Sequence, residues 1–271
     1  MKRAPKSRLL ILCALALLPA GCSEVAISGR TQFNFVPGST MNSMSFKSYG
    51  EFLTEHKLST NAEQTQMVKR VGGRIQKAVE DYSAENGLED QLAGYEWEFN
   101  LVDDPNVNAW AMPGGKVVVY TGLLSIAQGE AGLAVVMGHE IAHAFAKHGA
   151  ERMSQGLLVQ MGSIALSTAL EDRPEQTKNL FMQSYGVGTQ LGVLLPYSRV
   201  HESEADHLGL VFMAMAGYNP EEAPVFWERM AAEKKGAAPP EFLSTHPADE
   251  TRIQNLKDLL PEAMRYYRRT Q

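Results

Sequence analysis

The feature that most constrains this chain is the segment His-Glu-Ile-Ala-His at residues 139–143, which lies inside a strongly apolar stretch with helical periodicity. Residues four apart share one face of a helix, with their Cβ atoms about 6 Å apart, so His139 and His143 can bind the same metal ion. Glu140 points about 100° around the helix axis, where it can reach a metal-bound water without binding the metal. Burying these three side chains without partners would be costly, so the pattern favours a metal site over core packing.

A third ligand is available further along the chain. A catalytic zinc site has three protein ligands and keeps one position for water. Glu202 and Asp206 lie four residues apart on one face of a second predicted helix. With Glu202 as ligand, Asp206 can accept the ring N–H of a zinc-bound histidine and fix its tautomer. Glu204 points to another face and is predicted to be a solvated charge.

The number and positions of the cysteines argue against thiol chemistry in the main domain. The chain has two, Cys13 and Cys22, and both lie near the N-terminus. They can neither staple a core nor supply thiolates to a structural metal site in the main domain. A site built from histidine and carboxylate is therefore the natural one.

Hydrophobic periodicity predicts many helices and few strands, which indicates an α+β fold. Turn residues predict a polar loop over residues 172–178, and Ser198 is expected to cap the helix that follows it. The predicted elements are a helix over 61–87, strands over 95–101 and 116–120, and helices over 130–149, 154–170, 198–215, from 219 and from 246.

The first 21 residues have the layout of a secretory signal, with a basic start, an apolar run over residues 9–18 and small residues before Cys22. The run is too short to span a bilayer, which takes about 20 residues. Ala20-Gly21-Cys22 resembles the lipobox of bacterial lipoproteins, although Pro19 departs from that pattern, and simple secretion is the alternative. We therefore expect a signal peptide (1–21), a lipidated tether or N-terminal arm attached through Cys22 (22–45) and one main domain (46–271).

Charge argues against nucleic acid as a partner. The chain has 25 basic and 31 acidic residues, a formal charge of −6. Four of the basic residues lie in the first eight positions, before any acidic residue, so removing the signal leaves −10. A domain this acidic is poorly suited to phosphate backbones.

Several separated motifs, in the same order, resemble the zinc metallopeptidase family of the CAAX prenyl endopeptidases and the heat-shock protease HtpX, specifically its bacterial lipoprotein branch. The matching segments are Gly29-Arg30, residues 108–115, residues 138–143 with His148, Ser198-Arg199, residues 202–206, His246-Pro247 and Arg252. The resemblance implies a mainly helical, zincin-like (gluzincin) domain. It also implies one zinc ion bound by His139, His143 and Glu202, with Glu140 as the catalytic base.

The resemblance places His246-Pro247 beside the active-site cleft, and His246 is therefore the candidate donor to the oxyanion of the reaction. The alternative is a histidine that merely starts a helix before a proline at its first position. Arg252 is a candidate support for this region, or else forms a surface salt bridge. His148 is expected either behind the zinc ligands or at the surface.

Residues 108–124 are the candidate substrate shelf. A Gly-Gly turn leads into Lys116–Tyr120, which we expect to be an edge strand lining the cleft, where an extended peptide can add by main-chain hydrogen bonds. Binding of this kind reads backbone more than side chains, and predicts broad specificity for unfolded segments. An ordinary core strand is the alternative.

These features predict a zinc metalloendopeptidase, anchored by lipid to the outer membrane and facing the periplasm, that hydrolyses misfolded or damaged envelope proteins. The alternative is a chaperone or assembly factor for outer-membrane proteins with a latent protease site, working with the assembly machinery. It is suggested by the apolar stretches at residues 156–170 and 186–195, which could cover the cleft. A weaker alternative is a zinc hydrolase of small amides or wall peptides.

Overall fold

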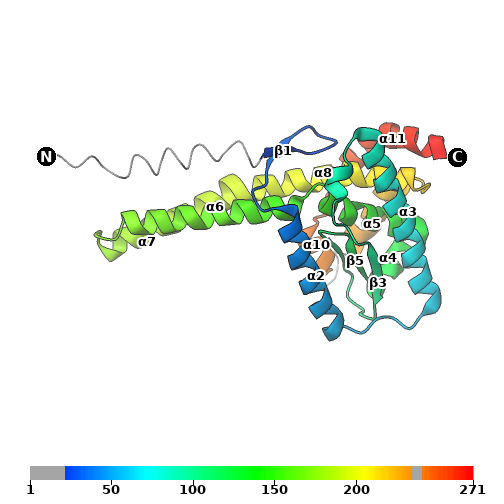
Figure 1. Ribbon diagram of the computed structural model, residues 1–271, viewed down its shortest axis with the longest axis horizontal. Helices are drawn as coiled ribbons and strands as arrows, with labels where there is room; N and C mark the ends of the chain where they lie inside the picture. The colour runs from blue at the N-terminus through cyan, green and yellow to red at the C-terminus, as the bar shows by residue number, and fades with distance from the viewer. Residues whose placement is uncertain (1–21, 234–239, 271) are drawn as a thin grey trace. The chain divides into compact units, whose positions relative to one another are not determined.

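The computed structural model describes residues 22–233 and 240–270, which fall into two compact units (Figure 1). The larger unit comprises Gly38–Gly149 and Leu195–Gln271, and the smaller comprises the chain up to Pro37 together with Ala150–Leu194. The expected signal peptide, residues 1–21, lies outside the described residues.

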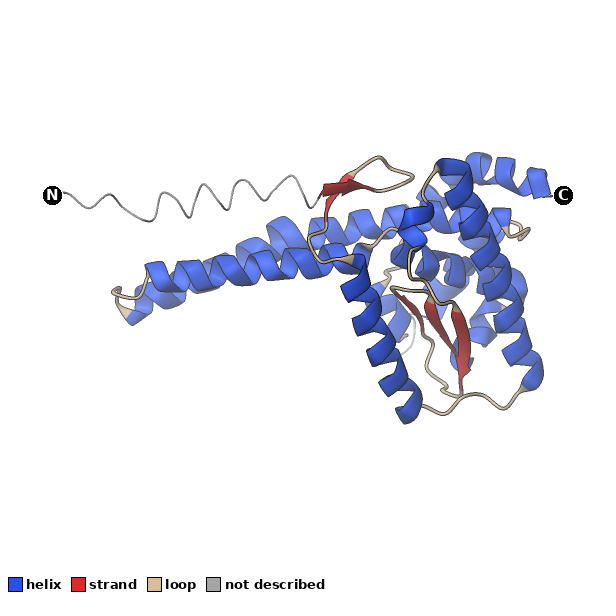
Figure 2. Cartoon of the chain, in the orientation of Figure 1, coloured by secondary structure: helices blue, strands red, loops and turns tan. Residues whose placement is uncertain are grey.

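The larger unit is mainly helical with one small sheet, which confirms the predicted α+β class (Figure 2). Its helices are α2 (Gly38–Glu55), α3 (Ala62–Asn86), α4 (Leu124–Ala127), α5 (Glu130–Phe145), α8 (Leu195–Met215), α9 (Glu222–Ala232), α10 (Glu241–Thr245) and α11 (Glu250–Thr270), with short 3₁₀ turns at Glu89–Leu92 and Thr121–Leu123. Its strands are β3 (Glu98–Val102), β4 (Ala109–Met112) and β5 (Lys116–Tyr120).

The sheet has the order β3-β5-β4, with β3 parallel and β4 antiparallel to β5. The prediction that Lys116–Tyr120 is an edge strand is therefore wrong, because β5 is the central strand and all of its residues are buried. A continuous apolar run is typical of a strand covered on both faces. β4 is an edge strand, because among the described residues it pairs only with β5. It packs against α5, the helix that contains the HEIAH segment.

Local capping explains why α3 has its predicted bounds. Asn61 caps its start, with its Oδ1 accepting the backbone N–H of Gln64 at 3.1 Å. Gly87 ends the helix in the left-handed region, with φ 66°, which glycine adopts without steric cost.

Other boundaries differ from the prediction. The apolar helix expected over 130–149 breaks after Phe145, and Lys147, at φ 57°, turns the chain into α6 (His148–Ala169). Ser198 caps no helix, because α7 (Glu175–Thr189), a π-helical turn (Gln190–Leu194) and α8 follow one another without a break. The glycines of this stretch disfavour helix by up to about 1 kcal/mol each, and tertiary context overrides that preference.

The smaller unit contains a two-stranded hairpin, β1 (Cys22–Glu24) with β2 (Thr31–Phe33), and the helices α6, from Ala150 onward, and α7. The hydroxyl of Tyr185 on α7 donates to the carbonyl of Val159 on α6 at 2.9 Å and ties the two helices together. Within residues 22–233 and 240–270, no helix combines the length and apolarity needed to cross a bilayer. The segment expected as an arm, 22–45, contains β1, β2 and the beginning of α2.

Two glycines let α5 and α8 approach closely. A Cβ on Gly138 would lie 2.9 Å from the carbonyl oxygen of Gly209, and a Cβ on Gly209 would lie 2.9 Å from the backbone nitrogen of His139. The backbones of the two helices are therefore in contact. This contact brings the HEIAH segment of α5 close to the carboxylates of α8.

We expect Gly209→Ala to lower the free energy of unfolding by about 1–3 kcal/mol, because the added methyl group must push the two helix backbones apart. Urea unfolding followed by circular dichroism measures the effect. The matched control is Gly73→Ala on α3, where an added Cβ meets no atom within 4 Å. Helix propensity should make that variant as stable as the wild type or more so. Equal behaviour of the two variants would contradict the close-approach argument.

Candidate metal centre

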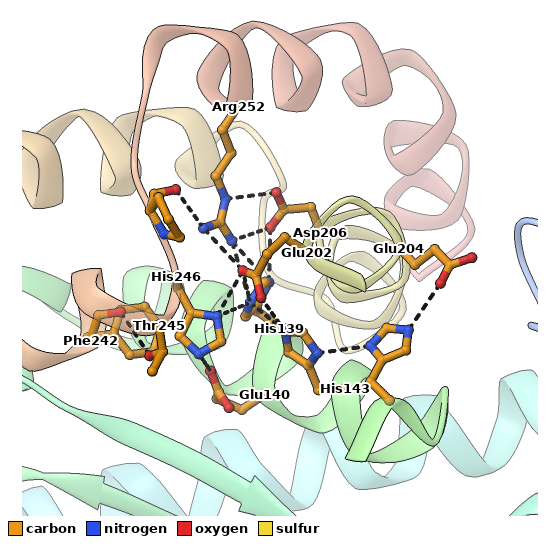
Figure 3. Close-up of polar contacts among 12 residues, drawn as sticks. His139, Glu140, His143, Glu202, Glu204, Asp206, Phe242, Thr245, His246 and Arg252 are labelled. Atoms are coloured by element: carbon orange, nitrogen blue, oxygen red, sulfur yellow. Dashed lines mark hydrogen bonds and ion pairs between the residues drawn. The ribbon is translucent and has the colours of Figure 1, made fainter. Parts of the chain in front are cut away.

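Four side chains from three segments of the larger unit converge on one point (Figure 3). His139 and His143 come from α5, Glu202 comes from α8, and His246 follows the last residue of α10. One ligand atom of each lies within 4.8 Å of those of the other three. The structure thus brings together the three predicted zinc ligands and the candidate oxyanion donor.

The spacing of the donor atoms fits a single metal ion. The Nε2 atoms of His139 and His143 are 3.0 Å apart, and the carboxylate oxygens of Glu202 lie 3.4 Å and 3.3 Å from them. Ligands about 2.0–2.2 Å from a tetrahedral ion lie about 3.3–3.6 Å from one another. The two distances to Glu202 lie in this range, and the 3.0 Å between the imidazole nitrogens is slightly shorter. Imidazole and carboxylate together suit zinc and related divalent ions.

Protonation states in the centre suit metal binding. Burial lowers the pKa of His143 well below its usual value, so this imidazole is neutral. Burial opposes ionisation of Glu202, but hydrogen bonds from the surrounding histidines outweigh it and hold the carboxyl pKa far below its usual range. For His139, burial lowers the pKa, while hydrogen bonds to Asp206 and Glu202 dominate and raise it to about 9. A metal ion binding here therefore displaces a proton from His139.

Glu140 lies beside the donors but outside the set. It is buried, and its Oε1 has no hydrogen-bond partner among the described residues. That oxygen lies 3.3 Å from Nε2 of His246. Burying a carboxylate oxygen without a hydrogen-bond donor costs free energy, and such groups are typical of sites that bind a ligand or a water molecule.

His246 is closer to the donors than the sequence suggested. Its Nδ1 lies 2.8 Å from Oε2 of Glu202 and 3.1 Å from Nε2 of His139. The interpretation of His246 as a helix start is wrong, because it ends α10 and the next helix begins at Glu250. Its ring faces the metal centre with one nitrogen and Glu140 with the other.

Asp206 and Arg252 lie on the Nδ1 side of the His139 ring and hold it in position. Oδ1 of Asp206 lies 2.9 Å from Nδ1 of His139, as expected for a carboxylate that fixes the tautomer. Arg252 donates to both oxygens of Asp206, from Nη2 at 2.7 Å and from Nε at 2.8 Å, and stacks on Trp227. Arg252 is buried, so the alternative of a surface salt bridge is wrong.

Comparison with known proteins decides the family. Residues 69–260 match the model of Peptidase family M48. The chain belongs to this family. The match contains every residue of the metal centre, from His139 to Arg252. M48 membership implies a divalent metal ion, and the His/Glu group described above is where this chain would hold it.

The relatives of this chain include metalloendopeptidases and a further protease. The chain is 36% identical over 243 residues to the mitochondrial metalloendopeptidase OMA1 of Schizosaccharomyces pombe, covering 88% of this chain and 66% of the relative. It is 32% identical over 272 residues to OMA1 of Saccharomyces cerevisiae, covering 93% of this chain and 75% of the relative. It is 29% identical over 170 residues to the beta-barrel assembly-enhancing protease of Escherichia coli, covering 60% of this chain and 34% of the relative. Family and relatives together identify the chain as a metalloendopeptidase.

Two further residues near the M48 centre, Glu204 and His148, are buried. Glu204, predicted to be a solvated charge, is buried, with 5% of its surface exposed. His148 is fully buried and contacts His143, so the alternative of a surface position is wrong. Helical periodicity could not find this contact, because His148 lies beyond the break at Lys147, where the chain turns.

Proposed function

We propose that this chain is a zinc-dependent endopeptidase of the bacterial lipoprotein branch of its family, which hydrolyses misfolded or damaged proteins of the cell envelope. The observation that carries the catalytic part is the convergence of His139, His143 and Glu202 beside the buried carboxylate of Glu140. The cellular part rests on the signal-like N-terminus and its lipobox-like end at Cys22.

Each residue of the metal centre has a separate role in peptide hydrolysis. His139, His143 and Glu202 would hold zinc, which supplies a positive charge that acidifies water and polarises the substrate carbonyl. Glu140 takes the proton of the attacking water as base, and later passes it to the departing amine nitrogen. His246, held through Nδ1 by Glu202, presents Nε2 beside Glu140 and can donate a hydrogen bond to the developing oxyanion.

The substrate is proposed to bind as an added strand. β4 is a sheet edge that packs against α5, the helix that carries Glu140. An extended peptide that pairs with β4 makes main-chain hydrogen bonds, which depend little on side chains. Unfolded proteins expose such segments and folded ones do not, so this mode of binding selects damaged or misfolded substrates.

Anchoring at the outer membrane, facing the periplasm, follows from acylation of Cys22 in this proposal. More than one acyl chain on one residue holds a soluble domain stably at a membrane, whereas a single chain binds only marginally. Metabolic labelling with a palmitate analogue should mark the wild type and leave Cys22→Ser unlabelled. Equal labelling of the two proteins would contradict the tether.

Removing the metal tests the catalytic proposal. Purified protein lacking residues 1–22 should cleave casein, lose at least about 100-fold in rate when treated with 1,10-phenanthroline, and regain activity when zinc is added back, because the ion supplies several kcal/mol of charge stabilisation. Zinc content measured by mass spectrometry should follow activity. Cleavage that survives chelation would contradict the proposal.

A second candidate function is supported by the surface of the α6–α7 hairpin. Large apolar side chains that are 38–64% exposed lie along both helices and the π-helical turn after α7, namely Leu157, Leu158, Met161, Ile164, Leu180, Phe181, Val187 and Leu191. Exposed apolar surface of this extent is typical of sites that bind other proteins. Similarity to a beta-barrel assembly-enhancing protease supports a role as assembly factor for outer-membrane proteins, with their assembly machinery as a partner. Rescue of an envelope-assembly defect by Glu140→Gln would favour this function, and failure to rescue would count against it.

A further inference from the structure

Behind His143, on the side away from Glu202, lies a second chain of buried polar groups. Nδ1 of His143 lies 2.9 Å from Nδ1 of His148, and Nε2 of His148 lies 3.1 Å from Oε2 of Glu204. Both His148 and Glu204 are buried, with 0% and 5% of their surface exposed. These contacts lie within the larger unit.

We propose that His148 and Glu204 form a relay that positions His143 for metal binding. His143 must present Nε2 to the ion, so its proton has to sit on Nδ1. The 2.9 Å contact then requires Nδ1 of a neutral His148 to accept that proton's hydrogen bond, which leaves the N–H of His148 on Nε2. Nε2 of His148 donates to the Glu204 carboxylate, so the ring protons of His143 and His148 each have one defined position.

With this relay, each of the two metal-binding histidines is linked through its Nδ1 to a carboxylate. Nδ1 of His139 contacts a carboxylate directly, that of Asp206. Nδ1 of His143 reaches a carboxylate through one intervening imidazole. Carboxylates behind metal-bound histidines fix the ring orientation and raise the basicity of the ligand, and their loss typically costs 10–100-fold in metal affinity or activity.

The turn between α5 and α6 produces this arrangement. α5 ends at Phe145, and the chain turns at Lys147, which has a left-handed conformation, so that His148, the first residue of α6, contacts His143. His148 then stacks on His201 of α8, with ring centroids 4.3 Å apart and planes inclined by 16°. The stack fixes the plane of the relay ring, so His148 cannot rotate without losing this contact.

The inference rests on the proposed zinc peptidase function, and zinc affinity of the purified chain, measured by competition with a chelating dye, tests it. His148→Leu keeps a similar volume but removes the acceptor, and should bind zinc about 10–100-fold more weakly. His148→Asn places an amide oxygen near the position of Nδ1 and should recover part of the loss. Glu204→Gln keeps the shape of the side chain but not its charge, and should also weaken binding.

The control is His207→Leu on α8, whose histidine pairs with Glu262 and makes no polar contact with the metal centre among the described residues. Its zinc affinity should equal that of the wild type. In the cobalt-substituted proteins, the visible spectrum should change in His148→Leu and not in His207→Leu, because only the first alters how a ligand ring is held.

The outcomes separate the relay from the function on which it rests. Folded His148→Leu and Glu204→Gln proteins with wild-type zinc affinity and cobalt spectra would overturn the relay and leave the peptidase proposal intact. A wild type that binds no zinc would overturn both. If His148→Leu fails to fold, wild-type affinity in Glu204→Gln alone would overturn the relay.

Discussion

Glu140→Gln is expected to lower kcat/KM for peptide hydrolysis by about 10²–10⁴-fold while leaving zinc affinity unchanged. Glutamine has the same shape as glutamate, but its amide cannot take a proton from water at neutral pH. Glu140 lies beside the metal-binding set without belonging to it, so the metal should remain. Cleavage of a fluorogenic peptide and zinc content, measured on the same preparation, give the two quantities.

The separation of these two effects makes the experiment decisive. Glu63→Gln, an exposed substitution on α3, is the control for a change of charge and should leave both quantities as in the wild type. Loss of zinc in Glu140→Gln would mean that Glu140 helps to build the site rather than to move protons. Near-normal cleavage by a zinc-loaded variant would remove Glu140 from the catalytic role.

The parts of this centre that local geometry controls could be predicted from sequence. His139 and His143 share a helix face because they lie four residues apart, and the same spacing joins Glu202 to Asp206. That Asp206 contacts a metal-binding histidine could be predicted from the usual partner of a metal-bound imidazole, and the structure shows that this histidine is His139. Each of these inferences needs one helix and one metal ion, and no knowledge of how distant segments pack.

The parts that depend on packing could not be predicted. The helical pattern alone predicts a solvent-exposed Glu204, and only the turn of the chain at Lys147 places His148 against it. The order of strands is likewise invisible in a local pattern, which is why β5 was expected at the edge that β4 occupies. His246 contacts His139 of α5 and Glu202 of α8. This position depends on where α10 ends in the folded chain, and a His-Pro pair does not encode that.

Arg252→Ala is expected to lower the free energy of unfolding by about 3–5 kcal/mol, because it leaves the buried carboxylate of Asp206 without its counter-charge. Burial alone disfavours ionised Asp206, and the charge of Arg252 is the largest influence that keeps its pKa below the usual value. Guanidinium unfolding followed by fluorescence measures the loss, and Trp227, which lies under Arg252, is a local reporter. Arg70→Ala is the control, since Arg70 pairs with Glu130 at the surface, where such pairs contribute about 0–1 kcal/mol.

A double substitution separates stability from metal binding at the same pair. Replacing both partners, Arg252→Leu with Asp206→Leu, removes the unpaired charge and should recover most of the stability lost in Arg252→Ala, because apolar replacement of a buried ion pair is often neutral or better. The double variant still lacks the carboxylate behind His139, so its zinc affinity should stay about 10–100-fold below that of the wild type. Recovery of both quantities would mean that the pair only fills space, whereas recovery of stability alone assigns Asp206 to the metal centre.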